Sequence, residues 1–256
     1  MGNARSVKNT IISTAAYITA AVLLIVLTVV ARKIDYAYFS SYKPFKPAEM
    51  ITEAVFIIAA SVLIIKHRGK GLLKSVGKHL LFAVIPLALV FAAFFYLPDK
   101  IMPADLNMVH TLDLFLSAFA DDFILCAAGC TLLLHKADLK TAGVVIMLVG
   151  MAAYELVLSE EKGAVLALSV IAVIVIGYFE IQLHMSSGSA LFCGIFHFLL
   201  HLTMHLPHLN SAQTEPYFGS AAARTLYIIS LSSMLVIGII LNRKRRIKSG
   251  KIKASV

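Results

Sequence analysis

Long apolar runs separated by short polar segments dominate the sequence. The apolar runs cover roughly residues 10–31, 49–66, 78–97, 107–134, 141–158, 163–183, 188–206 and 220–242. Each run is close to the ~20 residues that an α-helix needs to cross a hydrocarbon core of about 30 Å. The pattern therefore predicts an all-α polytopic membrane bundle of about eight transmembrane helices, folded as a single domain over residues 1–256.

The composition agrees with this prediction, because 59% of the 256 residues are hydrophobic and only 14% are charged. The first run exceeds the usual ~7–15 residues of a signal-peptide core and no small-residue cleavage site follows it, so we expect a retained anchor. Cys126, Cys130 and Cys193 all fall inside apolar runs. Their odd number argues against a disulfide framework and favours buried small side chains.

Basic residues gather beside alternate ends of the runs. If both chain ends are inside, the inner segments hold Arg5, Lys8, the basic residues of 66–78 and the basic tail 243–256. The positive-inside rule then predicts cytoplasmic termini and a multi-pass protein, most simply of the plasma membrane. The first outer connection opposes this topology through its own basic residues, Arg32, Lys33, Lys43 and Lys46.

The formal net charge of +9 could also suggest nucleic acid as a partner. The basic residues lie next to the ends of apolar runs, where anionic lipid headgroups attract them. We therefore expect lipid headgroups, and no nucleic acid, as partners of these charges.

Ionisable side chains inside two of the runs form polar faces. At 100° per residue, four side chains of the fourth run fall within a sector of roughly 80°, namely His110, Asp113, Ser117 and Asp121. In the seventh run a second face is formed by Cys193, His197, His201 and His205. Such residues are costly in hydrocarbon and are functional candidates by default. We expect the two faces to meet near the middle of the membrane, with Asp121 and His197 at matched depth.

Carboxylates and imidazoles together permit two chemistries. They suit zinc or another divalent metal ion, which can activate water at an open coordination position. Without a metal, a carboxylate can take a proton from water while an imidazole donates to a developing oxyanion. Tyr154 and Glu155, toward the outer end of the fifth run, could support either chemistry.

Two short motifs resemble those of the CPBP family of intramembrane metalloproteases, the CAAX-protease and bacteriocin-processing group. That family carries Glu-Glu-x-x-x-Arg, Phe-x-x-x-His and His-x-x-x-Asn motifs. This chain has Asp121-Asp122-Phe-Ile-Leu-Cys126 at the first, and His197-Phe-Leu-Leu-His201 at the third. The third motif also follows Gly177-Tyr178 and Ser187-Gly188-Ser189, a setting similar to that in the family.

The chain departs from the family pattern at three positions. Cys126 stands at the arginine position, His201 at the asparagine position, and Tyr154, with Glu155 beside it, where the histidine of the second motif is expected. The similarity covers about residues 107–206, which would form a CPBP-like core.

The resemblance implies a hydrolase, an intramembrane metallopeptidase that cleaves a membrane-embedded or lipidated peptide or protein. Asp121, Asp122, His197 and His201 would be catalytic, with Asp121 as general base toward water. A divalent metal such as zinc would lie on Asp121, His197 and His201. Supporting roles would fall to His110, Asp113, Tyr154 and Glu155.

Two other functions remain open. The departures at Cys126 and Tyr154 favour a catalytically degenerate relative. Such a protein would be a membrane scaffold or regulator that binds a partner protein in the cleft that corresponds to the family's active site. The histidines His110, His197, His201 and His205 could instead ligate a metal or haem. A transporter would more often show broken spans in two related halves, which this sequence lacks.

Overall fold

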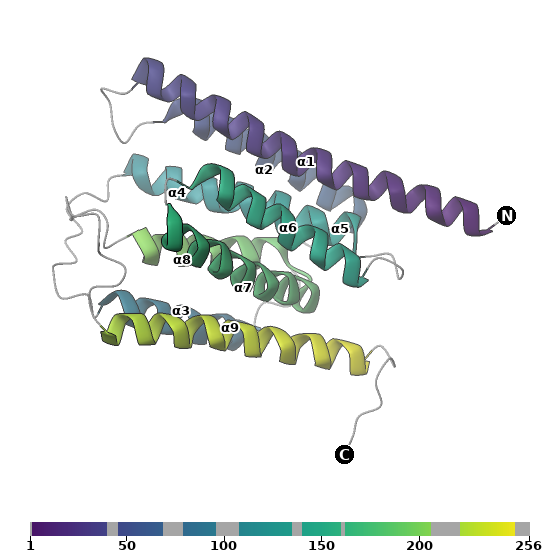
Figure 1. The fold of residues 1–256 in the computed structure, drawn as a ribbon. Helices are drawn as coiled ribbons and strands as arrows, with labels where there is room; N and C mark the ends of the chain where they lie inside the picture. Colours follow the sequence, from purple (N-terminus) through teal and green to yellow (C-terminus); the bar gives the residue numbers. More distant parts are fainter. Residues whose placement is uncertain are drawn as a thin grey trace.

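A computed structural model of the chain describes residues 2–39, 46–68, 79–95, 108–134, 140–159, 162–205 and 221–248. All regular secondary structure in these residues is helical (Figure 1). In chain order the helices are α1 (Gly2–Phe39), α2 (Pro47–Arg68), α3 (Leu80–Phe95), α4 (Met108–Asp121), η4 (Asp122–Ala128), α5 (Gly129–Leu132), α6 (Lys140–Leu158), α7 (Gly163–Ser187), α8 (Ala190–His205) and α9 (Ala221–Lys248).

The helices lie side by side with similar axis directions (Figure 1). The pair α1 and α2 lies on one side of the bundle and the pair α3 and α9 on the other, with α4, α6, α7 and α8 between them. The start of α1 and the end of α9 lie at the same end of the bundle, as an even number of crossings requires (Figure 1).

Six helices in the described part of the chain are long and apolar enough to cross a membrane. The expected third and seventh spans instead form shorter apolar helices, at Leu80–Ala92 and Ala190–Thr203. The protein is therefore a multi-pass helical membrane bundle, with six full-length spans in the described residues where the sequence predicted about eight. Helix α9 continues to Lys248, so the first part of the expected basic tail is helical, while 249–256 lie outside the described residues.

The path α4–η4–α5 forms the centre of the bundle. In the apolar stretch of its span, Thr111–Leu132, 83% of the residues are buried. The corresponding share is 22–33% in the other five spans. Where those helices expose large apolar side chains, they would meet lipid instead of water. All seven residues of η4, a π-helix, are buried. A π-helix turns less per residue than an α-helix and recurs at functional sites, so the centre of this path is a candidate for chemistry.

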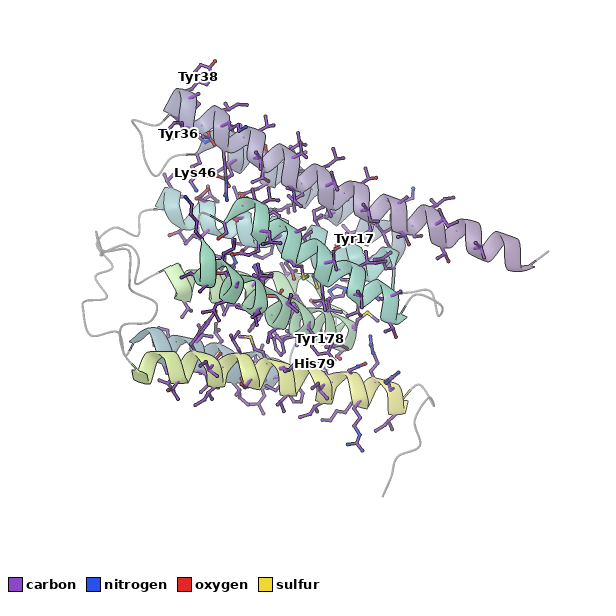
Figure 2. The ribbon with its side chains drawn as sticks, viewed as in Figure 1. Tyr17, Tyr36, Tyr38, Lys46, His79 and Tyr178 are labelled. Carbon is purple, nitrogen blue, oxygen red and sulfur yellow. The ribbon has the colours of Figure 1, made fainter. Side chains whose placement is uncertain are left out.

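Tyr17 of α1 supports the π-helix from outside. Its hydroxyl donates a 3.1 Å hydrogen bond to the backbone oxygen of Leu125, and Figure 2 shows where Tyr17 lies along α1. Glycines leave space for the ring, because a Cβ at Gly129 or Gly150 would lie 2.9 or 3.0 Å from Tyr17 atoms. The contact fixes α1 against the irregular segment.

A tight corner joins α7 to α8. Gly188 adopts a left-handed φ of 70°, and its N–H donates to the oxygen of His184 over 2.8 Å. The hydroxyl of Ser189 then accepts from the N–H of Phe192 over 3.2 Å, as an N-cap does. The short corner returns α8 alongside α7, which places Glu180 opposite His197.

Candidate functional site

A cavity of about 380 Å³ lies among the central helices. Side chains of α1, α2, the α4–η4 path, α6, α7, α8 and α9 line it. Much of the α7 wall is apolar, whereas the walls from α2, α4 and α8 carry most of the ionisable groups. These ionisable groups fall into two sets. The junction group, where α1 meets α2, consists of Arg32, Lys46, Glu49 and Asp113. The central group consists of Glu53, Asp121, Asp122, Tyr154, Glu180, His197 and His201.

The junction group is held together by ion pairs. The Nε of Arg32 donates to Oε1 of Glu49 over 2.7 Å, and Nη1 of Arg32 donates to the backbone oxygen of Leu158 over 2.8 Å. The Nζ of Lys46 lies 3.6 Å from both Oε2 of Glu49 and Oδ2 of Asp113. The cations thus neutralise buried carboxylates. Arg32 ties α1 to α2 and to the end of α6, and Lys46 ties the start of α2 to α4.

Lys46 lies just before α2, outside the spanning segment (Figure 2). Burial lowers the pKa of Lys46, but the carboxylates of Asp113 and Glu49 raise it by more, so the net pKa lies above its usual value. Two of the four basic residues that opposed the expected topology, Arg32 and Lys46, are therefore bound to carboxylates. The orientation of the termini stays a prediction.

A histidine–carboxylate pair lies in the central group. The Nδ1 of His197 is 2.6 Å from Oε1 of Glu180, and the side chains are 14% and 2% exposed. Nε2 of His197 is buried and has no hydrogen-bond partner among the described residues. The ring of His201 lies 4.5 Å from that of His197, one turn along α8. Glu180 therefore fixes the imidazole and leaves Nε2 available for a ligand.

Two further carboxyl groups of the central group are buried with free oxygens. The hydroxyl of Tyr154 hydrogen-bonds to Asp121, but Oδ1 of Asp121 has no partner among the described residues. Both carboxyl oxygens of Glu53 are also without one. Buried polar groups normally have hydrogen-bond partners. Several unpartnered carboxyl oxygens at one cavity therefore indicate a site for a ligand or for a reaction.

The structure brings most of the expected site residues together. Seven of them line this one cavity: Asp113, Asp121, Asp122, Tyr154, Glu155, His197 and His201. Asp121 ends α4 and Asp122 begins the π-helix, and both face the cavity. The side chain of His110 lies outside the described part. Cys126, Cys130 and Cys193 are buried, none of them forms a disulfide, and none of them lines the cavity.

The sequence reasoning missed several lining residues: Arg32, Lys46, Glu49, Glu53 and Glu180. A signal for three of them was present. Glu49 and Glu53 stand one helical turn apart at the start of an apolar run, and Glu180 lies inside another. The rule that ionisable residues within spans are functional candidates would have selected these carboxylates.

The divalent metal expected on Asp121, His197 and His201 stays a prediction. Within the described residues no group of three or more histidine, cysteine, aspartate or glutamate side chains is placed to hold a metal ion. Asp121, His197 and His201 all line the cavity.

The fold and the cavity define a class, that of multi-pass helical membrane proteins with a buried, ionisable cavity. No protein-family model, no curated protein and no solved structure matches the chain.

Proposed function

We propose that this protein is an intramembrane hydrolase, similar to the CPBP family, that cleaves a peptide bond in a membrane-embedded or lipidated peptide or protein. The proposal rests on one observation. Asp121, with a free carboxyl oxygen, and the Glu180–His197 pair, with a free Nε2, face the same buried cavity.

These groups supply what metal-free peptide hydrolysis requires. Oδ1 of Asp121 accepts a proton from a water molecule as the water oxygen bonds to the substrate carbonyl carbon. The resulting oxyanion accepts a hydrogen bond from Nε2–H of His197, while Nδ1–H donates to Glu180. When the carbon–nitrogen bond breaks, the amine nitrogen takes the proton held by Asp121. The base is then restored for the next cycle.

Two features of the cavity support this assignment despite the departures from the family motifs. Tyr154, at the position where a histidine was expected, hydrogen-bonds to Asp121 and can orient the base. Arg32 of α1 lines the same cavity, so a guanidinium is present although Cys126 replaces the arginine of the first motif.

Single substitutions test the proposal in cells. Asp121→Asn and His197→Gln keep approximate side-chain size; the first removes the base, and the second replaces the imidazole donor with a neutral amide that cannot carry a positive charge. Each should reduce cleavage by about 10²-fold or more. The measurement compares new protein N-termini in cells that carry the intact protein or each variant. Lys33→Met, on the exposed face of α1, serves as the control.

A second candidate is a scaffold or regulator that binds a partner in the cavity. The replacement of motif residues by Cys126 and Tyr154 favours it. If folded Asp121→Asn and His197→Gln variants leave all N-termini and the cellular phenotype unchanged, the hydrolase assignment is wrong and the scaffold assignment takes its place.

A further inference from the structure

The carboxyl groups of the cavity outnumber its permanent cations. Seven acidic side chains line it: Glu49, Glu53, Asp113, Asp121, Asp122, Glu155 and Glu180. Arg32 and Lys46 are the permanent cations among the lining residues, and Glu49 and Asp113 already engage them. Apart from Glu155, the remaining acidic side chains belong to the central group.

Glu53 is the clearest unmatched group. It is 1% exposed, both of its carboxyl oxygens lack a hydrogen-bond partner among the described residues, and it lines the cavity. It lies one turn beyond Glu49 on α2, and Asp121 lines the same cavity. An acid buried in this way without a partner is costly, and a bound cation would remove that cost.

The shape and lining of the cavity restrict the cation. The carboxyl groups are spread around about 380 Å³, and the described residues provide no converging set for a metal ion. Leu168, Val173 and Ile176 of α7 provide an apolar wall within the same space. A compact hydrated ion matches neither feature. An alkyl chain ending in an ammonium matches both, because such groups bury the chain and keep the charge on polar partners.

We infer that Glu53 is the anionic anchor of a subsite for a primary ammonium on an alkyl chain. If the proposed function holds, the ammonium is the lysine side chain of the substrate peptide, and the subsite selects where the chain is cut. A free aliphatic amine offers the same chemistry, and the experiment separates the two sources.

The test measures binding, so it does not require turnover. Purified full-length protein in detergent is unfolded by heat in n-butylammonium chloride, in sodium chloride of equal ionic strength, and in n-butanol. Butylammonium should raise the unfolding midpoint in a saturable way, with an affinity on the order of millimolar for so small a ligand. Glu53→Gln should weaken this apparent affinity at least tenfold, on the scale of a lost charge-assisted hydrogen bond.

Asp35→Asn is the matched control. Asp35 accepts hydrogen bonds from the N–H groups of Ala48 and Glu49 at 2.9 Å and does not line the cavity. Asparagine keeps one of these two acceptors and removes the charge, so the control reports the loss of a nearby carboxylate that lies outside the cavity. The control should bind butylammonium as the intact protein does. The inference is wrong if Glu53→Gln binds as well as the intact protein, or if sodium chloride stabilises equally.

Short peptides identify the source of the ammonium. A lysine peptide that binds at least tenfold more tightly than its norleucine counterpart and than butylammonium indicates a peptide side chain. Butylammonium that binds as tightly as the lysine peptide indicates a free amine, and either result supports the subsite. Binding without any cleavage in cells would leave the subsite in place and remove the proposed function, so the two failures are distinguishable.

Discussion

The junction group and the central group contain similar residue types in different states of pairing. In the junction group, Arg32 and Lys46 contact the carboxylates of Glu49 and Asp113 directly. In the central group, Glu53 has no hydrogen-bond partner among the described residues, and Asp121 and His197 each have one free polar atom. Paired charges hold helices together, whereas unpaired buried groups are available to a ligand. The difference separates the residues that build the cavity from those that act in it.

The largest expected effect is on stability, in the junction group. Arg32→Met removes the nearer cation of Glu49, a residue 2% exposed, and the donor to Leu158. Glu49 then keeps only the longer contact to Lys46, at 3.6 Å, so the free energy of unfolding should fall by about 3 kcal/mol. Denaturant unfolding in detergent measures the loss, with Lys33→Met as a control on the exposed face of α1. Adding Glu49→Gln should recover part of it. A double variant as unstable as the sum of the singles would show that the two residues act independently.

The next effect falls on activity, in the central group. Glu180→Gln removes the carboxylate that holds Nδ1 of His197 at 2.6 Å. Under the proposed function, hydrolysis should fall by about 10²-fold with a changed pH profile, because the imidazole loses its orienting partner. The double variant with His197→Gln should lose little more than either single variant, since the pair acts as a unit. Fully additive losses would show that Glu180 does not act through His197.

A smaller effect is expected at the support of the π-helix. Tyr17→Phe removes the donor to the buried oxygen of Leu125 without changing the packing of the ring. The free energy of unfolding should fall by about 1–2 kcal/mol. Tyr36→Phe is the control, because Tyr36 is 77% exposed near the end of α1 (Figure 2). Equal stability of the two variants would mean that the hydrogen bond contributes nothing to the fold.

The smallest effect belongs to Lys46, half-exposed at the edge of the cavity. Lys46→Met should lower the free energy of unfolding by less than about 1 kcal/mol, as for exposed ion pairs. Because the carboxylates raise the pKa of Lys46 in the folded state, its contribution is fully present below its usual pKa of 10.5 and is lost at higher pH, as the folded-state group deprotonates. Unfolding of both proteins from pH 7 to pH 11 measures this change. A stability difference that instead grows at alkaline pH would contradict the assigned ion pairs.

The sequence by itself determined the helical membrane bundle and four of the residues that line the site. Apolar runs of spanning length leave the backbone no alternative to helices in hydrocarbon, so the helices could be placed to within a few residues over most of the described chain. Helical periodicity also identified Asp113, Asp121, His197 and His201 as members of polar faces, and all four line the cavity. Periodicity is a local property, which one segment of chain carries without its neighbours.

Only the tertiary structure decided which groups face one another. Arg32 reaches the oxygen of Leu158 across 126 positions, and Tyr17 reaches Leu125 across 108. The pairing of Glu180 with His197 depends on the corner at Gly188. The π-helix is a local deviation, and the contact with Tyr17 that supports it comes from a distant helix. Packing between helices assigns each buried charge a partner or leaves it free, and a pattern within one helix carries no information on that choice.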